Sequence, residues 1–222
     1  MTDRPVDIVS VQNPYNIHSF LQSYQLFTHK EDKPTPNPSR GRMFVMLRHP
    51  IDRISSSFYY YGKAHWEPNY DPELAHISLE LYAKQNRTDH NYLTRILNNK
   101  MDPNDDITPE DFYTAKEILR TKCLIGLLTE KEHSFQRFEK YFQWDYSSDR
   151  TKKCHERLLH WDFAMKHPHP HIPEQSEGFQ RIVQRNEYDL ELYEYARMLF
   201  QEQSNLFHYH TEGHVIERKG HF

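Results

Sequence analysis

The sequence predicts an α/β fold with a mostly parallel sheet, formed as one domain over residues 1–222. Three apolar segments of strand length occur along the chain, at 6–11, 43–47 and 123–128. Each is followed by a segment whose apolar residues recur at helical spacing. Strands that alternate with helices in this way pair in parallel, and helices then cover both faces of the sheet. The order strand, helix, strand therefore sets the fold class.

The first strand and helix are expected before residue 30. The segment Val-Asp-Ile-Val-Ser-Val at 6–11 is rich in β-branched residues, and Asn13-Pro14 ends it. Apolar residues then recur at helical spacing between Ile17 and Phe27. Prolines alternate with polar residues afterwards, so that residues 30–42 are expected to form a flexible loop.

The second unit begins with Met-Phe-Val-Met-Leu at 43–47, a continuous apolar run typical of a strand that is covered on both faces. Pro50 suits the first turn of a helix, because the N–H that proline lacks would have no partner there. The apolar face that follows starts at Ile51 and ends before Gly62. A strand, a tight loop and a helix are therefore predicted.

Helices are predicted for much of the remaining chain. Ser78 is expected to cap a helix over 79–84, and Thr108-Pro109 to open one that extends to residue 120. After the third strand, residues 129–132 are expected to form a capping box for a further helix. A long helical pattern runs from Ser176 to Phe207, after a His- and Pro-rich segment at 167–173.

Composition excludes some classes of partner. No apolar run approaches the roughly 18 residues of a membrane helix, so we expect no membrane contact by this chain itself. The formal net charge of −4 disfavours a nucleic-acid partner held by overall charge. The two cysteines are too few for a disulfide framework.

The junction after the second strand is the best candidate for a binding site. Arg48 leaves an apolar strand where a helix begins, and the N–H groups and dipole at such a helix end favour a phosphate. The guanidinium adds a fork of donors. Ser56 shares a helix side with Arg53 and can offer its hydroxyl to the same phosphate. The alternative is an ordinary ion pair at Arg48 and serines that only pack.

This stretch resembles the sulfotransferases that use 3′-phosphoadenosine 5′-phosphosulfate, particularly the carbohydrate branch typified by heparan and chondroitin enzymes. Their 3′-phosphate motif is a strand that ends in Arg-x-Pro-x-x-Arg-x-x-Ser-x-Tyr. The chain has Arg48, Pro50, Arg53 and Ser56 at the matching positions, and Phe58 in place of the tyrosine. The resemblance implies that Arg48 and Ser56 hold the 3′-phosphate of this co-substrate, with Arg53 as the next contributor.

The same resemblance implies a P-loop-like, three-layer α/β/α fold and sulfuryl transfer to a carbohydrate hydroxyl. A second family feature, a strand followed by Gly-x-Thr-Glu and a helix, is similar to residues 124–130 with one extra residue. The likeness covers residues 6 to 142. The expected co-substrate is the phosphosulfate, the expected partner is a glycan acceptor, and no metal is implied.

The chain departs from the family at the loop that cradles the 5′-phosphosulfate. That loop normally carries a lysine followed by Gly, Ser or Thr residues, whose backbone N–H groups form an anion nest. Here the first lysine is Lys30 and the first glycine is Gly41. Two expectations follow: an N-terminally truncated sulfotransferase, or a catalytically silent nucleotide- or glycan-binding relic. A longer family-like precursor would imply a Golgi address, lumenal or membrane-bound, which this chain does not itself indicate.

In glycan-modifying members the catalytic base precedes the 3′-phosphate strand, which makes His18 and His29 the candidate catalytic residues, with Glu31 behind them. The alternative for His18 is an imidazole on a helix surface. For His29 it is a favourable contact with the dipole at a helix end.

Two histidine clusters, within 167–171 and 208–214, suggest a metal-binding protein as a further alternative. Prolines keep the first cluster extended, and no cysteine or carboxylate has a supporting spacing, so exposed imidazoles are expected instead. The aromatic residues at 59–61 and Trp66 can stack on a sugar ring or on adenine, or they can pack in the core.

Overall fold

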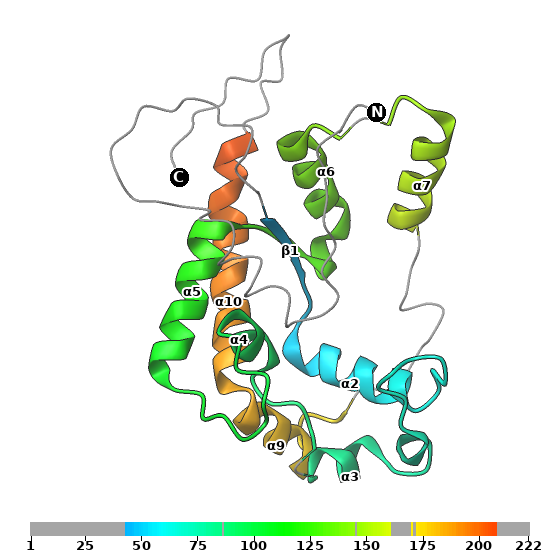
Figure 1. The fold of residues 1–222 in the computed structure, drawn as a ribbon, viewed down its shortest axis with the longest axis vertical. Helices are drawn as coiled ribbons and strands as arrows, with labels where there is room; N and C mark the ends of the chain where they lie inside the picture. The colour runs from blue at the N-terminus through cyan, green and yellow to red at the C-terminus, as the bar shows by residue number, and fades with distance from the viewer. Residues whose placement is uncertain (1–42, 86, 145, 161–169, 171, 208–222) are drawn as a thin grey trace, which may run out of the picture.

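The computed structural model describes residues 43–207 except for 86, 145, 161–169 and 171 (Figure 1). The strand expected at 6–11, the helix between Ile17 and Phe27, the loop at 30–42 and most of the His- and Pro-rich segment therefore lie outside the described residues. Within the described part, every helix is too short or too polar to cross a membrane.

The described sheet is a parallel pair of strands. These are β1 (Met43–Leu47) and β2 (Cys123–Leu127), and the register joins Met43 to Cys123 and Leu47 to Leu127. This confirms the α/β class and the parallel pairing at 43–47 and 123–127. Because the strands are parallel and in register, both end at the same edge of the sheet.

Helices cover both faces of this sheet. On one face lies α6 (Lys131–Phe142), where the ring of Phe138 is 4.5 Å from that of Phe44 in β1. On the other face, Ile125 and Leu127 belong to the main core together with α5 (Pro109–Lys122) and α10 (Glu187–Glu202). In Figure 1, β1 accordingly passes between α6 and the pair α5 and α10. Alternating side chains of each strand thus pack against helices on opposite faces of the sheet.

The helix α2 (Pro50–Tyr61) starts at Pro50 and ends before Gly62, as predicted. It buries Ile54 and Phe58 in a second apolar cluster, shared with α3 (Leu79–Ala83) and α9 (Glu177–Arg185). These three helices gather in the lower part of Figure 1. The element that leaves the sheet edge is therefore fixed along its length by core packing.

Local capping signals were reliable at two helix starts. The hydroxyl of Ser78 accepts a hydrogen bond from the N–H of Leu81, and Thr108 forms a reciprocal capping box with Asp111. The helix α4 (Tyr92–Leu97) and the helix α7 (Asp149–His160) were not anticipated. Short 3₁₀ turns complete the described chain: η1 (Pro72–Ala75), η2 (Leu128–Glu130) and η3 (Gln203–Phe207).

Two expectations were wrong. The capping box at 129–132 does not form, because Thr129 lies inside η2 and α6 begins at Lys131 without a side-chain cap. Ser134 instead accepts a hydrogen bond from the N–H of Leu127, which ties the helix to the strand. The continuous helix expected over 176–207 is interrupted at Asn186, whose buried amide bonds to the N–H of Asn91 and the carbonyl of Ile182.

Candidate functional site

The junction between β1 and α2 has an open helix end. His49 precedes the helix in an extended conformation and provides no side-chain cap, and Pro50 occupies the first turn. The first backbone hydrogen bond of the helix runs from the N–H of Arg53 to the carbonyl of His49, at 2.9 Å. The earlier N–H groups of a helix have no acceptor in a preceding turn, so they point out of the helix end.

Arg48 lies directly before this helix end and is half-buried. Among the described residues, no carboxylate forms an ion pair with its guanidinium. The ion-pair alternative for Arg48 therefore has no support in the described part of the chain.

Arg53, in contrast, already contacts other side chains of the protein. Its guanidinium pairs with Asp89 at 2.9 Å and lies over the ring of Tyr92, 4.6 Å from the ring centre. Burial, together with the charge of Asp89, raises the pKa of the neighbouring Tyr82 to about 12, so this tyrosine stays neutral. The Nη2 atom of Arg53 is buried and has no hydrogen-bond partner. Arg53 thus ties α2 to the 89–92 segment and retains one donor that no contact uses.

Ser56 follows Arg53 by three residues on α2, which puts both on one side of the helix. Its side chain is half-buried, whereas that of Ser55 is 2% exposed and packs. Within the described residues Ser56 and Arg48 do not contact each other, so their joint hold on a phosphate stays a prediction. The packing interpretation of the serines applies to Ser55.

The candidate bases His18 and His29 lie outside the described residues, and so does Glu31. The histidines within 167–169, at 171 and within 208–214 also lie outside them. Across the described residues, no group of three or more metal-ligating side chains comes together.

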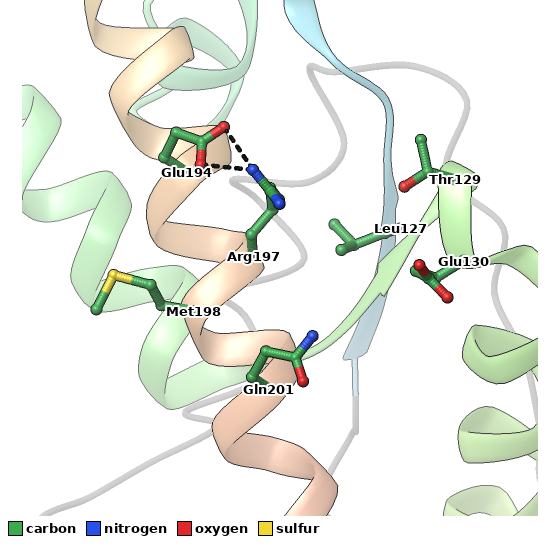
Figure 2. A pocket seen from close by; sticks show the side chains of 7 residues that line it. All are labelled: Leu127, Thr129, Glu130, Glu194, Arg197, Met198 and Gln201. Atoms are coloured by element: carbon green, nitrogen blue, oxygen red, sulfur yellow. Dashed lines mark hydrogen bonds and ion pairs between the residues drawn. The ribbon is translucent and has the colours of Figure 1, made fainter.

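A pocket of about 310 Å³ opens at the same edge of the sheet (Figure 2). One wall is formed by the end of β2 and by η2, and the other by one side of α10. The rings of His49 and Tyr193 meet at a steep angle, 5.2 Å between centres, so the α10 wall starts beside the junction. The lining residues are Leu127, Thr129, Glu130, Glu194, Arg197, Met198 and Gln201.

Arg197 is the cation of this pocket, and Figure 2 shows it reaching from α10 while paired with Glu194 at 2.9 Å. Both side chains are more than half exposed, so the pair is weak and exchangeable in water. Parallel sheets usually bind their ligands beyond the carboxyl ends of the strands. The pocket and Arg48 share that position.

The aromatic residues after the junction divide into two groups. Tyr59 and Tyr61 pack against the second apolar cluster, and burial raises the pKa of Tyr59. Trp66 is 68% exposed and Tyr60 is 40% exposed. Core packing therefore accounts for the first group only.

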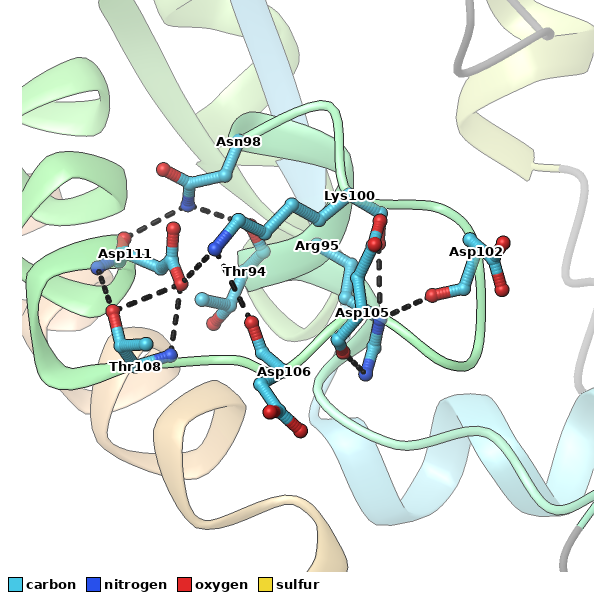
Figure 3. A network of polar contacts seen from close by, with 9 residues as sticks. All are labelled: Thr94, Arg95, Asn98, Lys100, Asp102, Asp105, Asp106, Thr108 and Asp111. Carbon is cyan, nitrogen blue, oxygen red and sulfur yellow. Dashed lines mark hydrogen bonds and ion pairs between the residues drawn. The ribbon is translucent and has the colours of Figure 1, made fainter.

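A polar network was missed by the sequence analysis (Figure 3). Arg95 is 6% exposed and donates to the carbonyls of Lys100, Asp102 and Asp105. Apart from the ring of His90, its partners are backbone carbonyls, which no side-chain pattern can reveal. The network fixes the connection between α4 and α5.

Asp111 joins this network through Lys100, whose Nζ lies 2.8 Å from the carboxylate. Burial opposes the charge of Asp111, but hydrogen bonds from Lys100 and Thr108 outweigh it and lower the pKa of the carboxyl. The ion pair is therefore structural.

Comparison of the chain with models of protein families, with curated proteins and with solved structures finds no match.

Proposed function

We propose that the chain binds the 3′-phosphate of 3′-phosphoadenosine 5′-phosphosulfate at the β1–α2 junction and transfers its sulfuryl group to a carbohydrate hydroxyl. The observation that supports this is the position of Arg48. It stands between the end of a parallel strand and an uncapped helix start, without an ion-pair partner in the described part of the chain.

Two charged side chains near this helix end act on a bound phosphate in opposite directions. Asp52 lies in the first turn of α2, and its carboxylate opposes an anion at the helix end. Arg48 offsets this with donors that bind phosphate at two points. The unused Nη2 of Arg53 and the hydroxyl of Ser56 are the further donors that we assign to the same group.

The layered arrangement supports the finer proposal of a P-loop-like fold, since helices lie on both faces of a parallel strand pair. We assign the rest of the nucleotide to the pocket beside Thr129 and Arg197. Its volume of about 310 Å³ is at the lower end of the range for small-molecule sites, roughly 300–1,000 Å³.

In the proposed reaction the acceptor oxygen attacks sulfur in line, and the bond from sulfur to the phosphate oxygen breaks. A base takes the proton of the acceptor hydroxyl, and the nucleotide bisphosphate leaves. His18 and His29 are the proposed bases. Arg48 holds the nucleotide and takes no part in bond breaking.

Isothermal titration with adenosine 3′,5′-bisphosphate tests the binding step. Arg48→Ala should raise the dissociation constant about 10- to 150-fold, which corresponds to the roughly 1.5–3 kcal/mol of a charge-assisted hydrogen bond. The control is Arg120→Ala, because Arg120 is exposed on α5 and pairs with Glu117 of the same helix. Failure of the folded wild-type chain to bind the bisphosphate would overturn the proposal.

The second candidate function is that of a catalytically silent nucleotide- or glycan-binding protein. The sequence supports it, because the first 40 residues hold no glycine for an anion nest. It shares the binding step but not the reaction. Incubation with labelled phosphosulfate and a panel of glycans separates the two, because only the enzyme transfers label to a glycan.

A further inference from the structure

An aromatic platform lies at the carboxyl end of α2, far from the junction. It consists of Tyr60, Trp66 and Tyr70, which are 40%, 68% and 39% exposed. Figure 1 shows this end of α2 and the loop after it on the side away from the sheet. The twelve residues of α2 make the helix roughly 18 Å long, so that Tyr60 near its end lies far from Arg48 before its start.

The platform is held rigidly. The hydroxyl of Tyr60 donates to Glu67 at 2.5 Å, and the rings of His65 and Trp66 meet edge to face, 4.9 Å between centres. The Glu67 hydrogen bond also raises the pKa of Tyr60, which keeps its hydroxyl protonated as a donor. Trp66 is therefore held by a ring contact, while most of its surface stays open to solvent.

The loop beneath the rings is fixed as well. Backbone hydrogen bonds run from Glu67 to Ala64 at 2.9 Å and from Tyr70 to Glu67 at 3.1 Å. Ala64 is 1% exposed and anchors the loop, and Asp71 is held by Arg87 at 2.5 Å. An aromatic ring that is ordered and exposed in this way loses little conformational freedom on binding.

The charged residues around the platform restrict the class of ligand that can bind there. Three carboxylates lie on the rim of the platform: Asp71 and Glu73 pair with Arg87, and Glu67 accepts from the hydroxyl of Tyr60. A polyanion gains nothing from such a rim, whereas the hydroxyls of an uncharged sugar can donate to the carboxylates. The apolar face of a pyranose can lie on the indole ring.

Two other occupants fit less well. Adenine is attached to the same ribose as the 3′-phosphate, so a nucleotide held at Arg48 cannot place its base at the other end of α2. A stable protein partner needs roughly 800 Å² on each side, far more than three partly exposed rings provide.

We propose that this platform binds pyranose units of an extended, uncharged or amino-sugar glycan by stacking on Trp66. This inference rests on the proposed function, and it specifies that the acceptor is a chain of several sugars rather than a single sugar. The reacting unit lies at the sheet edge, and a distant unit of the same chain contacts the platform.

The test is isothermal titration of the full chain with cellohexaose, with the hexamer of N-acetylglucosamine and with heparin. We expect at least one of the two uncharged hexamers to bind, and Trp66→Ala to weaken that binding about tenfold or more, since it removes the ring face that the sugar covers. The matched control is Tyr113→Ala, because Tyr113 is an equally exposed aromatic residue on α5, at 65%. Trp66→Phe should retain most of the affinity.

Binding of the bisphosphate should be the same in Trp66→Ala as in the wild type, which separates the two proposals. If neither hexamer binds, if heparin alone binds, or if Trp66→Ala and Tyr113→Ala behave alike, the platform proposal is overturned. If a hexamer binds through Trp66 but the bisphosphate does not bind, the platform stands and the proposed function fails.

Discussion

Asp189 is expected to contribute more to stability than any surface charge of the chain. Its carboxylate, 1% exposed, accepts hydrogen bonds from the N–H of Leu93 and the N–H of Thr94, both at 2.8 Å, and from the Thr94 hydroxyl at 2.9 Å. Asn91, at the start of α4, has a φ of 48° and gives no side-chain cap. The cap of this helix is therefore supplied by α10.

The magnitude follows from two opposing effects. Asp189→Ala leaves the N–H and the hydroxyl of the fully buried Thr94 without an acceptor, at about 1–3 kcal/mol for each buried group. Against this, burial raises the pKa of Asp189, so the charged carboxylate is itself costly to keep inside. We expect a net loss of about 2–4 kcal/mol, a large part of the roughly 5–15 kcal/mol that stabilises a domain.

Urea unfolding followed by far-ultraviolet circular dichroism measures this loss. Glu187→Ala is the matched control, because Glu187 lies in the same first turn of α10 and is exposed; its loss should stay below about 1 kcal/mol. Asp189→Asn keeps one acceptor oxygen and should fall between the two. If Asp189→Ala costs no more than Glu187→Ala, the capping role assigned to this carboxylate is wrong.

Two further predictions concern the core and the polar network. Gly126→Ala should cost about 1–3 kcal/mol in the same unfolding assay, because the added Cβ would lie 2.5 Å from the ring of the fully buried Phe138; adding Phe138→Leu should recover part of the loss, and additive losses would contradict the clash. The lowered pKa of Asp111 means that the unfolded chain binds more protons in acid, so its stabilising effect is complete above its ordinary pKa of 3.8 and is lost as the pH falls through the folded value. Asp111→Asn should flatten this acid slope of stability, and the exposed Glu110→Gln should leave it unchanged; equal slopes in the two variants would refute the assignment.

The elements that sequence predicted correctly are those with local signals. The apolar run of β1 needs only its own side chains, and Pro50 marks a helix start by its missing N–H. Thr108 and Asp111 cap the same helix from within four residues. Such contacts are short in sequence, so spacing alone reveals them.

The elements that sequence missed depend on partners far along the chain. The short helix α4 is capped by Asp189, 95 residues after Thr94, and the helix break at Asn186 serves the N–H of Asn91 at a similar separation. The helical spacing of apolar residues continues through the break, so periodicity predicts one helix. Only the tertiary contact explains why the chain stops and restarts there.

The candidate site was predictable in position but not in detail. Arg48 falls between strand and helix, as its place in the sequence indicated. Arg53 looks equivalent in the sequence, yet it pairs with Asp89, 36 residues later, and is partly used by the fold. An ion pair across that distance leaves no local pattern, so two arginines of one motif receive different roles.

The two ends of α2 give the chain a fixed spacing between its proposed contacts. Ile54 and Phe58 are 1% and 2% exposed, so the middle of the helix is held in the second apolar cluster and cannot rotate freely. The helix is roughly 18 Å long, so the sheet edge at its start and Tyr60 near its end are held apart by about that distance. A short acceptor would contact the sheet edge alone and be insensitive to Trp66, whereas a long one would gain affinity from the platform. Because α2 is rigid, we expect Trp66→Ala to weaken the binding of long acceptors and to leave that of short acceptors unchanged.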